Sequence, residues 1–229
     1  MYNKINYLSK YHKDIQIIQD KVEDIKEIPQ DWIEILCSKN SLKKVRKMLN
    51  LWKKYVRNEL SNTIMYMEEN LIDIELIKYR NQYSLLYSIK APDNTILYYE
   101  GKNPLDRIKP NELLDYWDKF PLSLRRFYEN VHNGFYYYAS GSMGLISVQD
   151  FVLFDKEDWS ILDELDTPLQ LCLKSTFGVF ASGMGGYVAI DALNCKNDNS
   201  TLWFSDAQPR YHINFWDVVD EWIVIGFQT

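Results

Sequence analysis

The sequence predicts an α+β protein in which amphipathic helices accompany strands joined by glycine turns. Some segments carry apolar residues at a spacing of three or four, others alternate with a period of two, and glycines separate the alternating segments. The clearest stretch is residues 177–192, FGVFASGMGGYVAIDA, where two apolar runs flank Gly183, Gly185 and Gly186. Because glycine adopts the positive φ angles of a tight reversal, this stretch predicts two adjacent strands.

Composition and charge narrow the class of protein. The chain has 229 residues, of which 46% are apolar, so it is long enough to bury a core of normal size. Residues 1–105 carry a net charge of +3 and residues 106–229 a net charge of −9, which gives −6 for the whole chain. An acidic second half disfavours nucleic acid as a ligand and favours a basic partner, although acidity that only maintains solubility explains it equally well.

The cysteines and the N-terminus indicate the compartment. Cys37, Cys172 and Cys195 are far apart, odd in number and without the CxxC spacing of a zinc or redox site, which is typical of free thiols in a reducing compartment. The first 16 residues lack the apolar core of a signal peptide, and no run of about 18 apolar residues occurs. We therefore expect a cytoplasmic protein without stable membrane insertion.

Three helices are predicted in the first 70 residues. Apolar residues at helical spacing predict an amphipathic helix over residues 11–25, which Pro29 ends, and a short second helix covers residues 32–36. Ser41 is a plausible N-cap for a longer helix that continues to about Asn70. The outward face of this helix is basic: Lys43, Lys44, Arg46, Lys47, Lys53, Lys54 and Arg57. It can be a solvated face, dock on the acidic second half, or lie on anionic membrane or phosphates.

A three-stranded meander is predicted for residues 72–100, where the period shifts towards two and polar turns intervene. Its first strand could equally prolong the preceding helix. Residues 101–110, GKNPLDRIKP, contain two prolines and one glycine and form a natural boundary. The expected organisation is therefore an N-terminal helical segment with a small β-meander, residues 1–105, followed by an α+β domain, residues 106–229.

The second half begins with helices and continues mainly with strands. Asn111 is expected to cap a short helix that runs to Trp117, and a second helix starts at Phe120-Pro121 and ends before Gly134. Strands are predicted at residues 135–138, 145–148 and 202–204, in addition to the two strands of residues 177–192. A final helix is expected to begin after Asn214 and to stop at Gly226.

No motif for catalysis, a cofactor or a metal stands out. His12, His132 and His212 lack metal-binding spacing, and a pair such as Cys195 and His212 would have to meet through the fold. The glycines of residues 182–186 match neither a nucleophile elbow nor a P-loop. Asp191, Asp206 and Asp217 are the carboxylates a glycosidase reading would use, but any acidic domain contains such triples. No catalytic residue, cofactor or metal is predicted.

The second half resembles the SUKH superfamily, which groups yeast cell-wall-synthesis regulators with bacterial immunity proteins of polymorphic toxin systems. The resemblance covers about residues 110–227 and rests on an ordered set of segments: FPLSLRRFYENVHNG, GSMGLISVQDF, VFASGMGGYVAID and NFWDVVDEWI. It implies a curved, largely antiparallel sheet flanked by helices and no enzymatic activity. It also implies that the protein binds and neutralises a cognate toxin, often a nuclease.

The expected binding site is the acidic segment of residues 155–166, DKEDWSILDELD. Toxins that act on nucleic acids or membranes tend to be basic, so an acidic inhibitor is steered towards them. We predict that this segment contacts the toxin through six acids and an aromatic anchor: Asp155, Glu157, Asp158, Asp163, Glu164, Asp166 and Trp159. The alternative function is a regulatory or scaffold module whose basic N-terminal helix docks on a membrane or on another protein.

Overall fold

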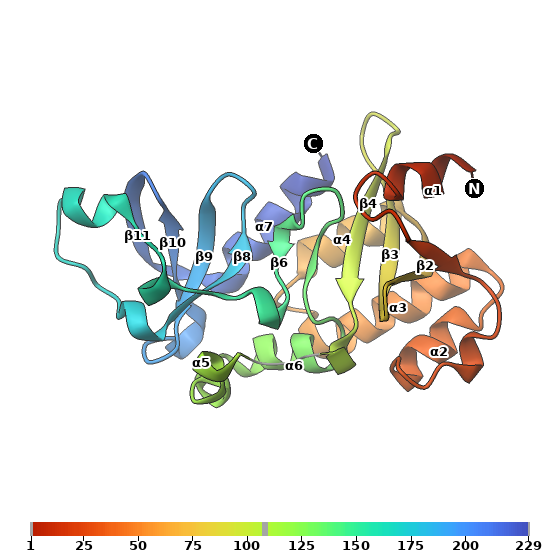
Figure 1. Cartoon of the computed structure of the whole chain (residues 1–229), viewed down its shortest axis with the longest axis horizontal. Helices are drawn as coiled ribbons and strands as arrows, with labels where there is room; N and C mark the ends of the chain where they lie inside the picture. The colour runs from red at the N-terminus through yellow and green to blue at the C-terminus, as the bar shows by residue number, and fades with distance from the viewer. Residues whose placement is uncertain (1, 107–109, 229) are drawn as a thin grey trace.

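The computed structural model describes residues 2–106 and 110–228 and shows an α+β fold built on one long antiparallel sheet (Figure 1). Ten strands follow one another across the sheet, and the two-residue strand β7 pairs with β8 at its side. In spatial order they are β1 (Gln16–Ile18), β2 (Leu71–Tyr79), β3 (Gln82–Lys90), β4 (Ile96–Lys102), β5 (Phe135–Tyr137), β6 (Ser142–Leu145), β8 (Thr176–Ala181), β9 (Gly186–Asp191), β10 (Asn199–Phe204) and β11 (Ala207–Asn214), with β7 (Val152–Leu153) off this path.

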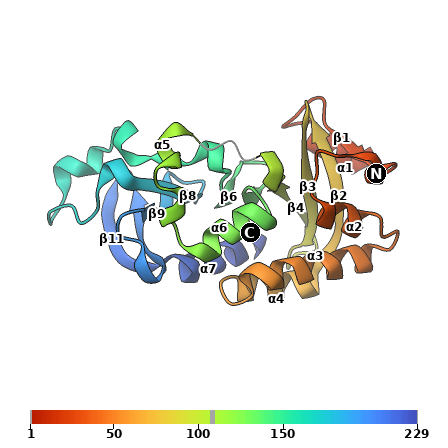
Figure 2. The ribbon, with the colours of Figure 1, turned by 90° about the horizontal axis from the view of Figure 1, so that it is seen from below.

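Seven helices lie on this sheet within the described residues. They are α1 (Tyr2–Leu8), α2 (Gln30–Leu36), α3 (Ser41–Val56), α4 (Ser61–Asn70), α5 (Asn111–Leu114), α6 (Leu122–Asn130) and α7 (Phe215–Gln228). Figure 2 shows α3 and α4 on one side of strands β2 to β4, and α1 on the other.

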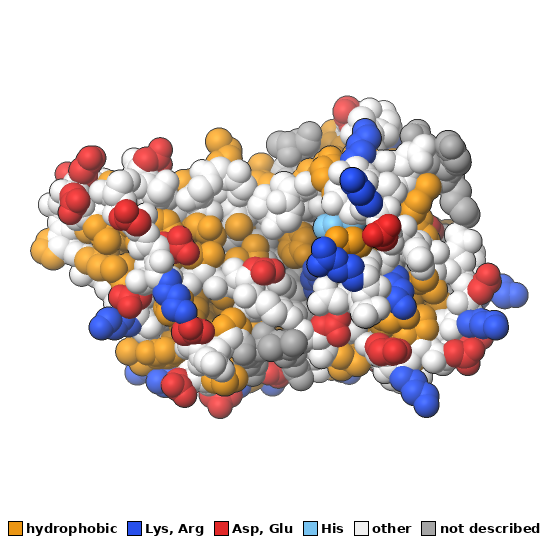
Figure 3. Space-filling view, in the orientation of Figure 1, with side chains coloured by type: hydrophobic (Ala, Val, Ile, Leu, Met, Phe, Trp, Pro, Cys, Tyr) orange, Lys and Arg blue, Asp and Glu red, His pale blue; other side chains and the backbone are white. Residues whose placement is uncertain are grey.

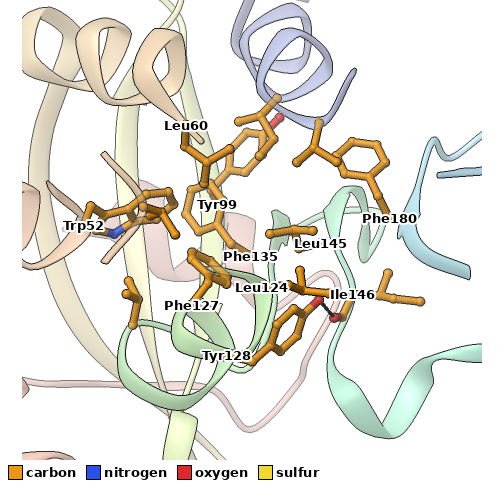
Figure 4. Close-up of a cluster of buried hydrophobic side chains, with 14 of the residues drawn as sticks. Trp52, Leu60, Tyr99, Leu124, Phe127, Tyr128, Phe135, Leu145, Ile146 and Phe180 are labelled. Carbon is orange, nitrogen blue, oxygen red and sulfur yellow. Dashed lines mark hydrogen bonds between the residues drawn. The ribbon is translucent and has the colours of Figure 1, made fainter. Parts of the chain in front are cut away.

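The main core lies between the sheet and helices α2, α3, α4, α6 and α7. Trp52 of α3 packs edge-on against Phe127 of α6 and Phe135 of β5, so the core continues from the first half of the chain into the second (Figure 4). Tyr128 of α6 is fully buried and donates from its hydroxyl to the Ile146 carbonyl at 2.7 Å. Burying a hydroxyl costs little free energy when it has a hydrogen-bond partner and much more when it has none.

Two smaller clusters cover the opposite face of the sheet. Near the N-terminus, Leu8 and Ile15 pack on Ile77 and Leu86 beneath α1. In the second half, the irregular segment of residues 154–173 packs on β9 and β10. The sheet is therefore covered on both faces in both halves of the chain, which explains why many of its strand residues are apolar on both sides.

Several sequence predictions are confirmed. The hairpin of residues 177–192 forms β8 and β9, with φ of 79° at Gly183 and 77° at Gly185. The meander forms β2, β3 and β4, and α2 is the predicted short second helix. The α+β class and the helix-flanked sheet are also correct.

The predicted helix of residues 11–25 is wrong. Residues 16–18 instead form β1, which pairs with β2, and a single 3₁₀ turn follows at residues 22–24. Ile15 belongs to the cluster beneath α1, whereas Val22 belongs to the main core on the other face of the sheet. The apolar residues thus serve two separate cores, and their helical spacing does not reflect one helix face.

The long helix predicted for residues 41–70 is divided. Leu60 has φ −123° and ψ 44° between α3 and α4. Asp220 of α7 reaches the start of α4, where its carboxylate accepts hydrogen bonds from the backbone N–H groups of Asn62 and Thr63 at 2.9 and 2.7 Å. The cap of α3 is also shifted by one residue, because the Asn40 side chain accepts from the Lys43 N–H.

Four further elements differ from the prediction. The strand expected at residues 145–148 ends at Leu145, the helix expected from Asn111 to Trp117 stops at Leu114, and the edge strand β11 was missed. The residues of β11 include Pro209 and alternate between exposed and half-buried. A proline within a strand is tolerated only at the edge of a sheet. Gly226 does not end the last helix but lies inside α7, where the missing Cβ gives room to a tyrosine of β4.

The boundary predicted at residues 101–110 lies partly outside the described residues, since 107–109 are not described. Gly101 and Lys102 belong to β4, and β4 pairs with β5 in the register Gly101↔Phe135. One sheet therefore joins the two predicted regions, and the division at residue 105 remains a prediction.

Candidate protein-binding surface

The acidic segment lies within an irregular excursion between β7 and β8. Residues 154–156 and 160–164 form 3₁₀ turns, and another 3₁₀ turn at 173–175 leads the chain into β8. Phe154, Trp159 and Ile161 are buried against Ala189 of β9 and Trp203 of β10. The spacing of these inward residues leaves the intervening charged side chains on the outside.

Trp159 forms part of this packing and is 7% exposed. Its indole N–H donates to the Phe154 carbonyl at 2.9 Å, and its ring lies 4.7 Å from Phe154 and 5.5 Å from Trp203, centroid to centroid. A side chain enclosed in this way does not reach a partner. The expectation of an exposed aromatic anchor is therefore corrected: Trp159 holds the segment on the sheet.

All six predicted acids are exposed: Asp155, Glu157, Asp158, Asp163, Glu164 and Asp166. None of them forms an ion pair with a residue in the part of the chain that the structure describes. The one lysine of the segment, Lys156, pairs with Glu112 of α5, so its charge is already partly compensated. Six carboxylates without such compensation within twelve residues give this end of the molecule a negative potential.

The backbone that carries these acids is tied to β11 and to the turn before it. Gln208 of β11 accepts from the Asp166 N–H at 3.1 Å and donates to the Glu164 carbonyl at 2.7 Å. Ser160 donates from its hydroxyl to the Ser205 carbonyl at 3.1 Å. Figure 3 shows acidic side chains gathered at the end of the molecule where this segment lies. A partner would thus bind a surface whose backbone is already held by hydrogen bonds, and not a free loop, which lowers the entropic cost of binding.

The basic face of α3 is largely engaged within the molecule. Lys44 pairs with Asp73 of β2, Lys53 pairs with Glu68 of α4, and Lys47 donates to the Glu34 carbonyl of α2 at 2.6 Å. Lys54 lies over the ring of Tyr55, with its ammonium 4.8 Å from the centroid. Lys44, Lys47 and Lys53 connect α3 to its neighbours, so the helix offers less free positive charge than its sequence indicates.

The residues considered for catalysis lie apart from one another or already form hydrogen bonds within the fold. The Cys195 thiol donates to the Lys119 carbonyl at 3.0 Å and burial raises its pKa, which opposes formation of a nucleophilic thiolate. His212 contacts Gln170. Asp191 accepts from the Ser175 hydroxyl and from the Leu193 N–H, as a turn-stabilising residue does.

Two other features are absent from the described residues. No group of three or more His, Cys, Asp or Glu side chains is arranged to hold a metal ion there. In the same residues, no helix combines the length and apolar character needed to cross a membrane.

Sequence reasoning missed two buried polar contacts that organise the fold. One is the Asp220 cap of α4. The other joins His132 to Tyr87 of β3, whose hydroxyl lies 2.6 Å from Nε2, while the Trp52 indole donates to the same hydroxyl at 3.1 Å. The position of His132 before Asn133-Gly134 gave no signal of burial, because only the fold brings β3 and α3 to that turn.

Comparisons of the chain with protein-family models, with curated proteins and with solved structures gave no match.

Proposed function

We propose that this protein is a non-enzymatic immunity protein of the SUKH type, which acts in the cytoplasm by binding and neutralising a basic protein toxin. The observation that carries the proposal is the exposed acidic segment of residues 155–166, held on the sheet by a buried aromatic cluster. Six carboxylates without ion partners among the described residues attract a basic surface over long range and can mimic a phosphate backbone. The order of helices and glycine-turned strands in the second half supports the family.

The mode of action follows from this geometry. Binding involves no covalent step. The Lys and Arg side chains of the toxin pair with the carboxylates, and the active surface of the toxin is covered. Electrostatic attraction mainly accelerates association, whereas close packing decides how slowly the complex dissociates. The complex should therefore be stoichiometric and sensitive to salt. A nuclease is the expected class of toxin, since a phosphate-binding surface is already complementary to an acidic one.

The alternative is a regulatory or scaffold module that docks through the basic face of α3. The ion pairs of Lys44 and Lys53 and the contact of Lys47 with Glu34 favour an internal role for this face. Sedimentation with anionic liposomes separates the two functions. Binding that is lost when Lys43, Lys44, Lys47, Lys53 and Lys54 are substituted would favour the scaffold function.

The experiment that tests the proposal starts from capture of the tagged full-length protein in its native host. The proposal predicts one basic protein recovered near one to one, released by salt, toxic when expressed alone and harmless when co-expressed. Recovery of several envelope proteins, or of a partner that is not toxic, would reject immunity as the function.

A further inference from the structure

A small cavity lies where the two halves of the chain meet, at the end of β4 and beside the turn that follows α6 (Figure 1). Its volume is about 180 Å³, and every described residue that lines it is polar or charged. Gln82 of β3 and Lys102 of β4 contribute from the first half, and Asn133 contributes from the second. A cavity with such a lining holds water or a polar ligand, because only apolar cavities stay dry.

The amide side chains of the lining are fixed by hydrogen bonds within the protein. The Asn133 amide nitrogen donates to Gln149 Oε1 at 2.8 Å, and its oxygen accepts from the Val148 N–H at 3.0 Å. The Asn103 amide nitrogen donates to the Glu27 carbonyl at 2.7 Å. Asn103 and Asn133 are each 1% exposed. Side chains held in this way keep their positions without a ligand, so the cavity is preformed and binding costs little conformational entropy.

The charged groups of the lining leave the cavity negative. Lys102 pairs with Glu100 at 3.1 Å, so its charge is already compensated. The carboxylates of Asp106 and Asp150 also line the cavity, and neither forms an ion pair with a described residue. Asp150 accepts a hydrogen bond from the Ser147 hydroxyl. Burial raises the pKa of Asp106, although Lys102 opposes the shift, so this carboxylate is poorly solvated in its charged form.

This lining selects a compact cation that donates several hydrogen bonds. Carboxylate oxygens only accept, and the amide oxygens of Asn133 and Gln149 each accept one bond from the described residues and have a second lone pair. A guanidinium group is planar, carries several N–H donors and pairs with carboxylates through parallel hydrogen bonds. It is also more weakly hydrated than an ammonium, so it loses less when it leaves water for a cavity. The cavity therefore favours a guanidinium over an ammonium.

We propose that this cavity is a binding site for a guanidinium group, whose N–H groups donate to the carboxylates of Asp106 and Asp150. Further N–H groups donate to the amide oxygens of Asn133 and Gln149. The guanidinium belongs either to a free small molecule or to an arginine side chain of another protein, and the binding chemistry is the same for both. All the lining residues lie outside the acidic segment of residues 155–166, so the site goes beyond the proposed function and does not depend on it.

The test follows the side-chain amide signals of the isotope-labelled full-length protein by NMR while a probe is added. The probes are methylguanidinium and a blocked Gly-Arg-Gly peptide, and their controls are methylurea and the same peptide with citrulline or lysine in place of arginine. A guanidinium probe should shift the signals of Asn133 and Gln149 in a saturable way, and the controls should bind about tenfold more weakly or less. Binding of methylguanidinium alone assigns the site to a small molecule, and binding of the arginine peptide as well assigns it to a protein side chain.

Matched carboxylate variants locate the binding. Asp106→Asn and Asp150→Asn each remove one charge and keep an acceptor oxygen, and each should weaken the binding of methylguanidinium about tenfold or more. Asp115→Asn is the control and should leave binding unchanged, because Asp115 is exposed at the end of α5 and outside the cavity. Should a variant fail to fold, the comparison of probes on the unmodified protein still decides. No saturable shift, equal binding of methylurea or of the lysine peptide, or an equal effect of Asp115→Asn would each overturn the proposal.

Discussion

His132 is fully buried and is surrounded by Trp32, Trp52, Phe127 and Phe135. Burial lowers its pKa to about 3. The imidazole is therefore neutral in the folded protein at ordinary pH, and this neutral ring fills the core and bonds to the Tyr87 hydroxyl. No carboxylate of the described residues forms an ion pair with this ring, and burial disfavours its charged form, so protonation opposes folding.

The first prediction concerns acid stability. In the unfolded chain His132 takes up a proton near pH 6.5, while in the folded chain it does so only near pH 3. The free energy of unfolding should therefore fall as the pH drops through this window, with up to about 1.4 kcal/mol per pH unit due to this one group. Urea unfolding between pH 7.5 and pH 4 measures it. His132→Gln should reduce the slope by one proton, and Phe127→Leu should lower stability without changing the slope. An unchanged slope in His132→Gln contradicts the burial argument.

The second prediction concerns Gly226 in α7. A Cβ at this position would lie 2.5 Å from the Tyr99 hydroxyl oxygen and 3.4 Å from Met143 Cε. Alanine favours a helix over glycine by about 1 kcal/mol, but the clash with fully buried Tyr99 should outweigh this gain. Gly226→Ala should therefore lower the free energy of unfolding by about 1–3 kcal/mol. Thermal unfolding tests this. Adding Tyr99→Phe removes the clashing oxygen and should restore part of the loss; a stabilising Gly226→Ala would show that helix propensity decides.

At the scale of elements, the division between α3 and α4 depends on α7. Asp220 is 4% exposed and accepts from two N–H groups at the start of α4, which have no partner within that helix. This contact joins residues more than 150 positions apart in the chain.

The third prediction tests that contact. Asp220→Ala leaves two N–H groups without their acceptor and should cost about 2 kcal/mol in the free energy of unfolding, while Asp220→Asn, which keeps one acceptor, should cost less. The exposed Asp217 on the same helix gives a control, since Asp217→Ala should change stability by at most about 0.5 kcal/mol. Chemical denaturation measures all three, and equal effects at positions 217 and 220 would reject the cap.

The sequence predicts well those elements whose residue pattern has a single local cause. The β8–β9 hairpin needs glycines at positive φ, and the strands of the meander are recognised because short polar turns separate them. The helix expected at residues 11–25 fails because its apolar residues pack in two cores on opposite faces of the sheet. The start of a separate α4 cannot be seen locally, since Asp220 caps it from the far end of the chain.

The same distinction applies to the candidate surface. Six adjacent acids predict exposure, because unpaired carboxylates are rarely buried, and all six are exposed. The role of Trp159 depends on Trp203 and Phe154, which only the fold brings to it. The basic face of α3 looks free in sequence, but Asp73, Glu68 and Glu34 engage its lysines from three other elements.

At the scale of the whole molecule, one antiparallel sheet runs from β1 in the first half of the chain to β11 in the second. The acidic segment packs on the face of β9 and β10 and is tied to β11, so it lies at one end of this sheet. The net charge of −9 in the second half should steer a basic partner to the end that carries the acidic segment.

The measurement that tests the proposed function most directly is calorimetric titration of the captured toxin into three forms of the protein, over a range of salt concentrations. The first is unmodified, and the second has the six acids 155, 157, 158, 163, 164 and 166 changed to Asn or Gln. The third has six other exposed acids changed in the same way: Asp14, Asp31, Glu69, Asp115, Asp217 and Glu221.

The second form should bind at least a hundredfold more weakly and lose most of its salt dependence, while the third should stay within a fewfold of the unmodified protein. Unchanged affinity in the second form, or an equal loss in the third, would contradict binding through the acidic segment.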